Sequence, residues 1–154
     1  INCGENGLCI PAEYQFPIYR ALLKSYLPIS TIIIMLGSND LFVGTSLAQI
    51  SKKMTGFAQM VKDAAPESDI ILVSPPHMQL GDWVQGQELI KRSSELGSVY
   101  RTIADTLVIR FADAAEWHVS LTYDGVHFSE DGHRAFAAGI LPFVSESKRE
   151  EPSL

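Results

Sequence analysis

Hydrophobic and polar positions follow two different periods along this chain. Three short apolar runs rich in β-branched residues, typical of strands buried on both faces, lie at 31–36, 69–74 and 107–111. Four longer segments with apolar residues three or four positions apart predict amphipathic helices at 13–26, 46–65, 85–105 and 128–144. Strands that alternate with helices favour parallel pairing through helical crossovers. The pattern therefore predicts an α/β chain with a parallel sheet and a three-layer α/β/α architecture.

The length and composition fit one domain with a substantial core. The chain has 154 residues, of which 46% are hydrophobic and 19% are charged, as expected of a globular domain rather than a disordered segment. Apolar periodicity ends near residue 144, and the remaining segment is rich in charge. We therefore expect one domain at 1–144 and a charged, disordered tail at 145–154.

Net charge limits the classes of partner that we expect, and the cysteines indicate the redox state of the compartment. The formal net charge is −6, and without basic clusters we expect neither nucleic acid nor a membrane as partner. The longest apolar run, at 32–36, is far shorter than the ~20 residues that span a bilayer. We expect Cys3 and Cys9 to be free thiols in a reducing compartment. With no leader in this sequence we predict a cytoplasmic location, unless a leader lay upstream of Ile1.

Polar residues gather after the predicted strands, where parallel sheets bind ligands. In the loop Asp124-Gly-Val-His127, a carboxylate three residues before an imidazole can accept the Nδ1 proton and leave Nε2 as a base. These are the candidate catalytic residues. The alternative interpretation is an Asp that caps the following helix and a His that only packs.

Two further loops offer candidate oxyanion donors. Asn39 follows the most apolar predicted strand and can aim its amide at a developing negative charge. The loop that contains Gly4 and Gly7 can add a backbone N–H group. The alternative interpretation of both loops is that they are ordinary turns.

Other residues receive weaker assignments. We expect an apolar substrate pocket around Leu41, Phe42, Met78 and Trp83, with Leu80 nearby. The glycine pattern contains no phosphate-binding loop, and no compact ligand spacing supports a metal site, so we expect no metal and no cofactor. The remaining histidines are expected to be structural or exposed; they are His77, His118 and His133.

Taken together and in this order, these motifs resemble the SGNH (GDSL-type) serine hydrolases, most closely the small arylesterase and acyltransferase-like members. Residues 35–40 are similar to the block whose Asn is an oxyanion donor, and residues 123–133 to the block whose Asp and first His complete the triad. The loop at 5–7 resembles the block that supplies a backbone donor, with Gly7 as the match and Gly4 as the alternative. The resemblance implies a flavodoxin-like fold.

The sequence departs from that family in one respect. The block Gly-Asp-Ser, which carries the nucleophile after the first strand, does not occur in it. The resemblance places that block upstream of Ile1. We therefore expect the sheet to lack its first strand, and a complementing N-terminal segment or second chain to supply strand and serine. The resemblance also implies that copies of the chain can form a homo-oligomer.

Three functional interpretations remain at this stage. The first is a serine esterase, with possible acyltransferase activity, that acts on a small short-chain acyl ester. In the second, Ser38 is the nucleophile, although the Gly-x-Ser-x-Gly spacing of a nucleophile elbow is absent. The third is a catalytically inactive fragment or a non-catalytic α/β binding module.

Overall fold

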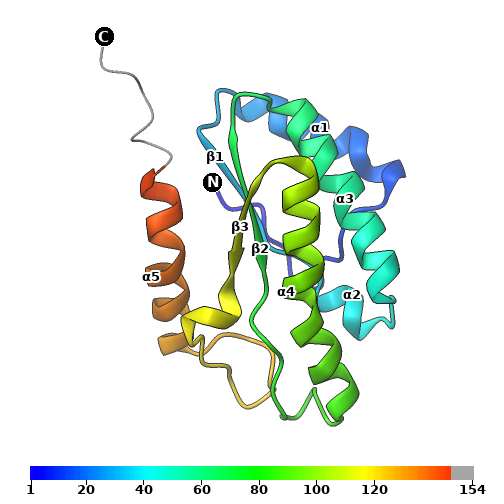
Figure 1. Cartoon of the computed structure of the whole chain (residues 1–154), viewed down its shortest axis with the longest axis vertical. Helices are drawn as coiled ribbons and strands as arrows, with labels where there is room; N and C mark the ends of the chain where they lie inside the picture. The colour runs from blue at the N-terminus through cyan, green and yellow to red at the C-terminus, as the bar shows by residue number, and fades with distance from the viewer. Residues whose placement is uncertain (147–154) are drawn as a thin grey trace.

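A computed structural model describes residues 1–146 and contains a small parallel sheet flanked by helices (Figure 1). The strands are β1 (Thr31–Ile34), β2 (Asp69–Ser74) and β3 (Arg110–Asp113). The α-helices are α1 (Phe16–Tyr26), α2 (Ser38–Phe42), α3 (Leu47–Ala64), α4 (Gln87–Leu107) and α5 (Glu130–Glu146). Two 3₁₀ turns, η1 (Glu13–Gln15) and η2 (Ala114–Trp117), complete the elements.

The sheet has the order β1-β2-β3, and both pairs of neighbours are parallel. Ile33 is paired with Ile71, and Leu72 with Phe111. Parallel neighbours need a crossover connection, which α3 and α4 provide. The predicted parallel α/β architecture is therefore confirmed, and the carboxyl ends of all three strands point to the same end of the molecule (Figure 1).

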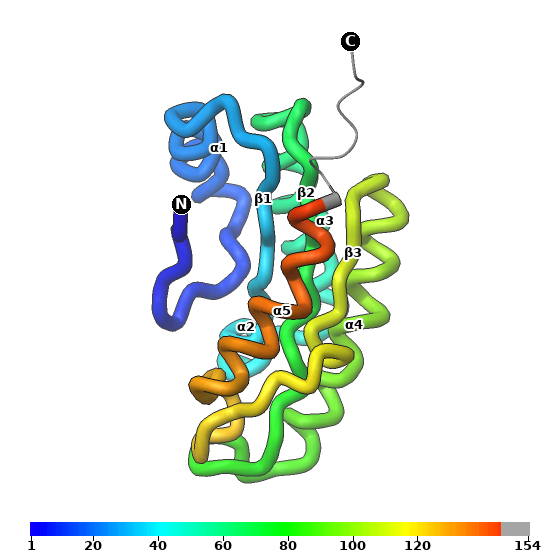
Figure 2. The backbone as a smooth tube through the Cα atoms, turned by 90° about the vertical axis from the view of Figure 1, so that its left-hand side faces the viewer, coloured from blue at the N-terminus to red at the C-terminus, as the bar shows by residue number. Residues whose placement is uncertain are grey.

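Helices cover both faces of the sheet, which makes three layers (Figure 2). On one face, α1, α3 and α4 bury the main core, whose members include Ile34, Met54, Leu72 and Tyr100. On the other face, α5 packs Phe136 and Ile140 against a smaller cluster that includes Ile71 and Val73. Successive side chains of a strand point to opposite sides of the sheet. Because helices cover both sides, the side chains of β2 are buried on both faces.

Within the described residues both outer strands of the sheet, β1 and β3, have an unpaired edge, and the edge of β1 has an unusual composition. β1 pairs with β2 on one side, and its other side is free in the described part of the chain. The sequence of β1, Thr-Ile-Ile-Ile, contains no charged residue and no proline. Ile33 points to the face covered by α5 and is 44% exposed. Natural edge strands usually carry charges, prolines or bulges that prevent further pairing. β1 therefore has the composition of an interior strand.

Two predicted boundaries need correction. The third strand begins at Arg110 rather than Leu107, because α4 continues to Leu107 and ends where Val108 adopts a left-handed conformation with φ of 51°. Part of the expected tail is helical, since α5 includes Ser145 and Glu146. The rest of that tail, 147–154, lies outside the described residues.

Candidate active site

Asp124 and His127 form a closely hydrogen-bonded pair beyond the carboxyl ends of the strands. Asp124 Oδ2 lies 2.8 Å from His127 Nδ1, while Oδ1 accepts hydrogen bonds from the backbone N–H groups of Val126 at 2.8 Å and His127 at 2.9 Å. The carboxylate thus holds both the backbone and the ring of His127. Because Nδ1 faces a carboxylate, the Nδ1–H tautomer is favoured and Nε2 keeps its lone pair.

The surroundings of Asp124 keep it ionised. Desolvation of this nearly buried carboxyl raises its pKa, but the hydrogen bonds from the backbone of His127 and Val126 and from the imidazole lower the pKa well below its usual range. The His127 side chain, in contrast, is 58% exposed. An ionised carboxylate behind an accessible imidazole is the arrangement that a general base requires.

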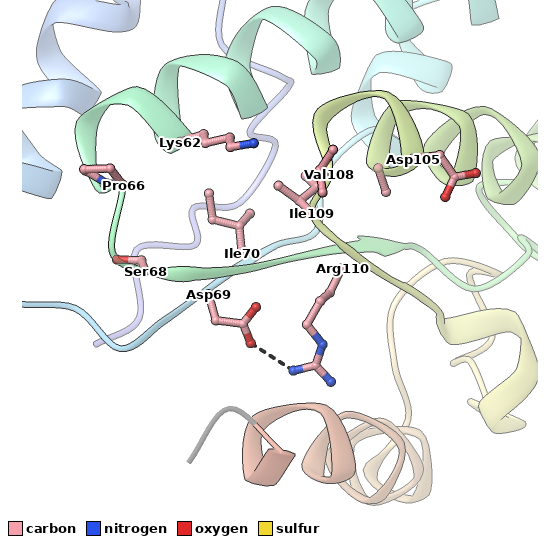
Figure 3. A pocket seen from close by; sticks show the side chains of 10 residues that line it. Lys62, Pro66, Ser68, Asp69, Ile70, Asp105, Val108, Ile109 and Arg110 are labelled. Atoms are coloured by element: carbon pink, nitrogen blue, oxygen red, sulfur yellow. Dashed lines mark hydrogen bonds and ion pairs between the residues drawn. The ribbon is translucent and has the colours of Figure 1, made fainter. Parts of the chain in front are cut away.

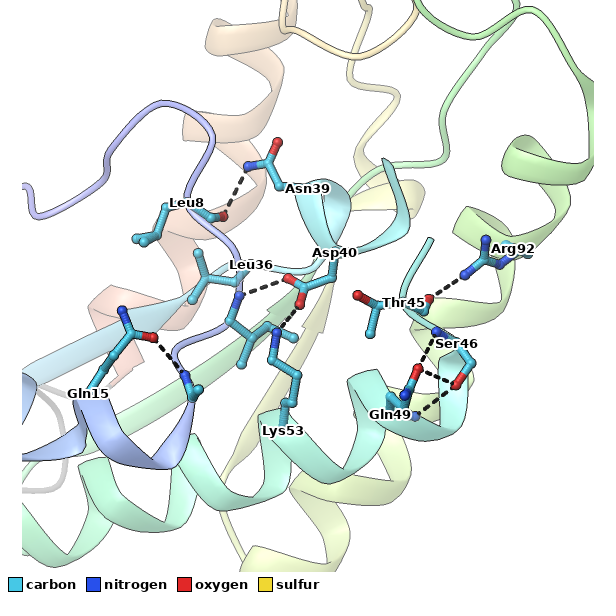
Figure 4. Close-up of polar contacts among 12 residues, drawn as sticks. Leu8, Gln15, Leu36, Asn39, Asp40, Thr45, Ser46, Gln49, Lys53 and Arg92 are labelled. Carbon is cyan, nitrogen blue, oxygen red and sulfur yellow. Dashed lines mark hydrogen bonds and ion pairs between the residues drawn. The ribbon is translucent and has the colours of Figure 1, made fainter. Parts of the chain in front are cut away.

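Asn39 and the Gly7 loop meet at a second polar cluster (Figure 4). Asn39 Nδ2 donates a 3.0 Å hydrogen bond to the Leu8 carbonyl, which leaves its second amide N–H available. Gly7, with φ of 73°, forms the turn in which the Leu8 N–H bonds to the Glu5 carbonyl. The two expected oxyanion donors therefore lie on adjoining segments.

Asp40 anchors the segment that follows Gly7 (Figure 4). Its carboxylate is completely buried and accepts a 2.8 Å hydrogen bond from the Ile10 N–H. It also forms an ion pair with Lys53, whose Nζ lies 2.5 Å from Oδ1. The ion pair offsets the cost of burying the carboxylate. Asp40 therefore fixes the N-terminal segment to α2 and α3 on the side of Asn39.

Tyr100 and Gly37 set the start of α2. The buried Tyr100 hydroxyl donates a 2.8 Å hydrogen bond to the Leu36 carbonyl, and burial together with the charge of Asp40 raises the pKa of Tyr100. Gly37 has φ of 113°, and a Cβ there would lie 2.3 Å from Tyr100 Oη. Only glycine fits both the conformation and the space. This contact positions Asn39, two residues later.

An aromatic row links α2 with the dyad. The Trp83 ring centroid lies 5.0 Å from that of His127 and 6.5 Å from that of Phe42, and both pairs are close to perpendicular. Trp83 is 59% exposed, whereas Leu41 and Met78 are 2% and 3% exposed and belong to the core. The expected pocket is therefore corrected: Trp83 lies beside the dyad and Phe42 beside Trp83, but Leu41 and Met78 do not line an open surface.

Two hollows lie away from the imidazole. One, of about 560 Å³, is at the amino ends of the strands, where Asp69 pairs with Arg110 at 2.9 Å and Lys62 Nζ donates to the Leu107 carbonyl (Figure 3). The other, of about 430 Å³, lies beside Gly7 and Lys53. In parallel α/β sheets ligands bind at the carboxyl ends of strands, so the first hollow is not the candidate active site.

Several other candidate groups do not join the site. His77, His118 and His133 are exposed. In the part of the chain that the structure describes, no three His, Cys, Asp or Glu residues are grouped to hold a metal, and none of the hydrogen bonds joins a hydroxyl, including that of Ser38, to His127. Cys3 and Cys9 are free thiols, and no helix among the described residues is long and apolar enough to cross a membrane.

Comparison with known proteins decides the family. Residues 3–135 match the model of the GDSL-like lipase/acylhydrolase family. The chain belongs to this family. Its relatives are SGNH-type ester hydrolases, so the family resemblance of the sequence is confirmed. A search of curated proteins finds no match.

Solved structures of this GDSL-like family share the fold. An inhibitor-bound aryl esterase from M. smegmatis is 25% identical with a TM-score of 0.76, and the match covers 85% of this chain and 67% of that one. Est24, a carbohydrate acetylesterase from Sinorhizobium meliloti, is 24% identical with the same TM-score and coverage. A catalytic mutant of Axe2, an acetylxylan esterase from Geobacillus stearothermophilus, is 19% identical with a TM-score of 0.73, covering 92% and 70%. About a third of each solved chain therefore has no counterpart here.

Sequence reasoning missed three residues that hold the backbone segments of the GDSL-like site in place: Asp40, Tyr100 and Gly81. The sequence marks Asp40 only as part of the segment 35–40 after the first predicted strand, and Tyr100 only as part of the helix predicted at 85–105. Gly81 carries no signal of its own, although it lies against the backbone of Asp124. The position of Asp40, directly after Asn39, was the one available signal, because a carboxylate following an apolar strand needs a partner when buried.

Proposed function

We propose that this chain carries the acid–base and oxyanion groups of a serine esterase that hydrolyses short acyl esters, while its nucleophilic serine comes from outside these 154 residues. The observation that carries the proposal is the 2.8 Å contact between Asp124 Oδ2 and His127 Nδ1 beside an accessible imidazole. Membership of the GDSL-like family supports ester hydrolysis as the reaction.

In the proposed reaction, His127 transfers one proton in each of the two half-reactions, acylation and deacylation. Its Nε2 takes the proton from the serine hydroxyl as the oxygen attacks the ester carbonyl, and then gives that proton to the departing alcohol. Water, deprotonated by the same Nε2, next attacks the acyl-enzyme; the bond between the acyl carbon and the serine oxygen breaks, Nε2 returns the proton to that oxygen, and the carboxylic acid leaves. Asp124 stays ionised throughout and stabilises the imidazolium.

Asn39 and Gly7 are the proposed oxyanion donors. The Asn39 amide keeps one N–H after its bond to Leu8, and the Gly7 N–H makes no hydrogen bond within the described residues. Donors that are fixed before the reaction stabilise the negative charge of the tetrahedral intermediate more than mobile water does. Asp40 and Tyr100 supply that rigidity from behind.

The unpaired edge of β1 is the proposed attachment point for the segment that carries the serine. A strand added there would pair with Thr-Ile-Ile-Ile and cover Ile33, which is 44% exposed. If it ran parallel to β1, its carboxyl end would meet the end of the sheet where the dyad lies. The third of each solved relative that has no counterpart here supports such a segment.

Short acyl esters are the proposed substrates. Two of the relatives are named for removing acetyl groups from carbohydrate and xylan, and a third is named as an aryl esterase. Phe42 and Trp83 form an apolar wall on the imidazole side, suited to the carbon skeleton of the ester. A wall that excludes water would also favour acyl transfer to an alcohol over hydrolysis.

The test is hydrolysis of p-nitrophenyl acetate by the natural gene product that contains this sequence, with the 154-residue chain alone as the control. We expect turnover by the gene product, loss of turnover in His127→Ala, and background rates for the chain alone. A fluorophosphonate, which bonds to activated serines with loss of fluoride, should label a serine outside these residues. Labelling of Ser38, or turnover that survives His127→Ala, would overturn the proposal.

A further inference from the structure

The loop between β2 and α4 is bonded directly to the loop that carries the dyad. Gln79 N–H bonds to the Gly125 carbonyl at 3.0 Å, Asp82 N–H to the Tyr123 carbonyl at 3.1 Å, and Trp83 N–H to the Asp124 carbonyl at 3.1 Å. We call residues 79–84 the clamp. Because these bonds join main chain to main chain, the clamp and the dyad loop form one rigid unit.

The clamp approaches the dyad loop too closely for any side chain to lie between them. A Cβ on Gly81 would lie 2.4 Å from the Asp124 carbonyl carbon and 2.5 Å from the Gly125 nitrogen. A Cβ on Gly125, whose φ is 82°, would lie 2.1 Å from the Gln79 oxygen. Both contacts are with backbone, which cannot swing aside as a flexible side chain does. Glycine at both positions is therefore a condition of the contact.

The base of the clamp is firmly seated in the core. Val84 is completely buried, and its N–H and carbonyl exchange hydrogen bonds of 3.1 Å with Gly81. The Met78 N–H bonds to the buried Ser93 hydroxyl on α4 at 2.9 Å. The clamp thus transmits the position of α4 and of the core to the Asp124 backbone.

The clamp also carries Trp83 to the ring of His127. The imidazole is 58% exposed, and among residues 1–146 its one side-chain hydrogen bond is that with Asp124. An exposed imidazole held by one hydrogen bond can turn about its side-chain torsions into other rotamers. The centroid of the Trp83 ring lies 5.0 Å from that of the imidazole, and the two rings are inclined at 81°, so the indole packs directly against His127.

We propose that Trp83 is a positioning residue for His127 and that Gly81 makes its placement possible. This inference rests on the proposed function and deepens it. Trp83 restricts the imidazole to the rotamer in which Nδ1–H bonds to Asp124, which keeps the Nε2 lone pair facing the serine. The indole takes no proton and forms no bond during the reaction.

The spectroscopic test reads the imidazole and needs no turnover. In the ¹⁵N-labelled natural gene product that contains this sequence, the His127 ring, assigned by its absence in His127→Ala, should show one tautomer with a slowly exchanging Nδ1 proton. We expect Trp83→Ala to lose that proton signal and to average the two ¹⁵N shifts, and Trp83→Phe to restore both. The wild-type spectrum in Trp83→Ala would overturn the inference.

A pair of glycine variants tests the clamp in the same way. Gly81→Ala should disturb the His127 signals as Trp83→Ala does, whereas Gly86→Ala, whose Cβ meets nothing within 4 Å, should leave them unchanged. Equal spectra from the two variants would overturn the role of Gly81. Should Gly81→Ala fail to fold, Trp83→Ala and Trp83→Phe still decide the matter, because Trp83 is 59% exposed.

Kinetics of the natural gene product separate positioning from substrate binding. Misplaced catalytic groups lower kcat, so Trp83→Ala should lower kcat about 10-fold to 100-fold, in addition to any rise in KM from loss of the apolar wall, and Trp83→Phe should recover most of kcat. A raised KM with unchanged kcat would overturn the positioning role. If the wild-type chain showed no Nδ1 proton on His127, the proposed function itself would fail, which is a different outcome from a normal dyad that ignores Trp83.

Discussion

The carboxylate of Asp40 accepts a 2.8 Å hydrogen bond from the backbone N–H of Ile10, thirty positions earlier in the chain. This bond ties the end of the Gly7 loop to the residue that directly follows Asn39. The two proposed oxyanion donors consequently depend on one buried group. Their relative position is set by Asp40 together with the hydrogen bond from Asn39 Nδ2 to the Leu8 carbonyl.

The first prediction concerns that buried carboxylate. Asp40→Ala leaves the Ile10 N–H and Lys53 without their partner, and we expect the free energy of unfolding to fall by about 3 kcal/mol. Asp40→Asn should cost less, because an amide oxygen can still accept from Ile10. Urea unfolding of the three proteins measures both values. Equal stability of Asp40→Ala and the parent chain would contradict the anchoring role.

Removal of the Asn39 amide should impair catalysis more than binding. In the natural gene product, we expect Asn39→Ala to lower kcat for p-nitrophenyl acetate by about 10²- to 10³-fold, the usual effect of losing one oxyanion donor. Gln59→Ala removes an amide from the outer surface of α3 and serves as the control. An Asn39→Ala enzyme with the parent kcat would remove Asn39 from the oxyanion site.

The lowered pKa of Asp124 predicts a loss of stability in acid. The unfolded chain protonates this carboxyl near pH 4, whereas the folded chain keeps it ionised to lower pH. The stability that Asp124 contributes is therefore present above about pH 4 and is lost as the pH falls below that value. Asp124→Asn should show a weaker dependence on pH between about 2 and 5 in urea unfolding. Parallel curves for the two proteins would contradict the prediction.

Two helix glycines should respond in opposite directions to alanine. A Cβ on Gly139 of α5 would lie 2.2 Å from Trp117 Cδ2, so we expect Gly139→Ala to destabilise the chain by about 1–3 kcal/mol. Gly56 of α3 has only the Phe16 ring, at 3.6 Å, and Gly56→Ala should stabilise by about 0.5–1 kcal/mol. Thermal unfolding measures both. Stabilisation by Gly139→Ala would show that α5 does not pack against Trp117 as described.

The sequence predicts those features that depend on local pattern. The pattern of hydrophobic residues identified all three strands. The second strand has the expected bounds because Pro75 directly follows its last residue, Ser74. The Asp124–His127 pair was predictable because the partners are three positions apart in the chain, so one loop suffices to bring them together. The same holds for the helix that begins after Ser46, whose hydroxyl accepts from the Gln49 N–H.

Features that depend on contacts between distant segments were not predictable in this way. The extension of α4 to Leu107 depends on Val108 turning left-handed, which its residue type does not favour. Leu41 lies in the short helix α2 and Met78 in the loop after β2, both close to strand ends, and tertiary packing buries both side chains. The role of Gly81 depends on the backbone of Asp124, far along the chain, and nothing in its neighbours indicates that contact.

The position of Val108 has a practical consequence. This residue is 83% exposed and follows α4 at the end of the sheet opposite to the dyad. A fluorophore or a surface tether attached there would stand across the length of the strands from His127. Immobilised on a sensor chip through that position, the molecule would present its imidazole to the flowing solution.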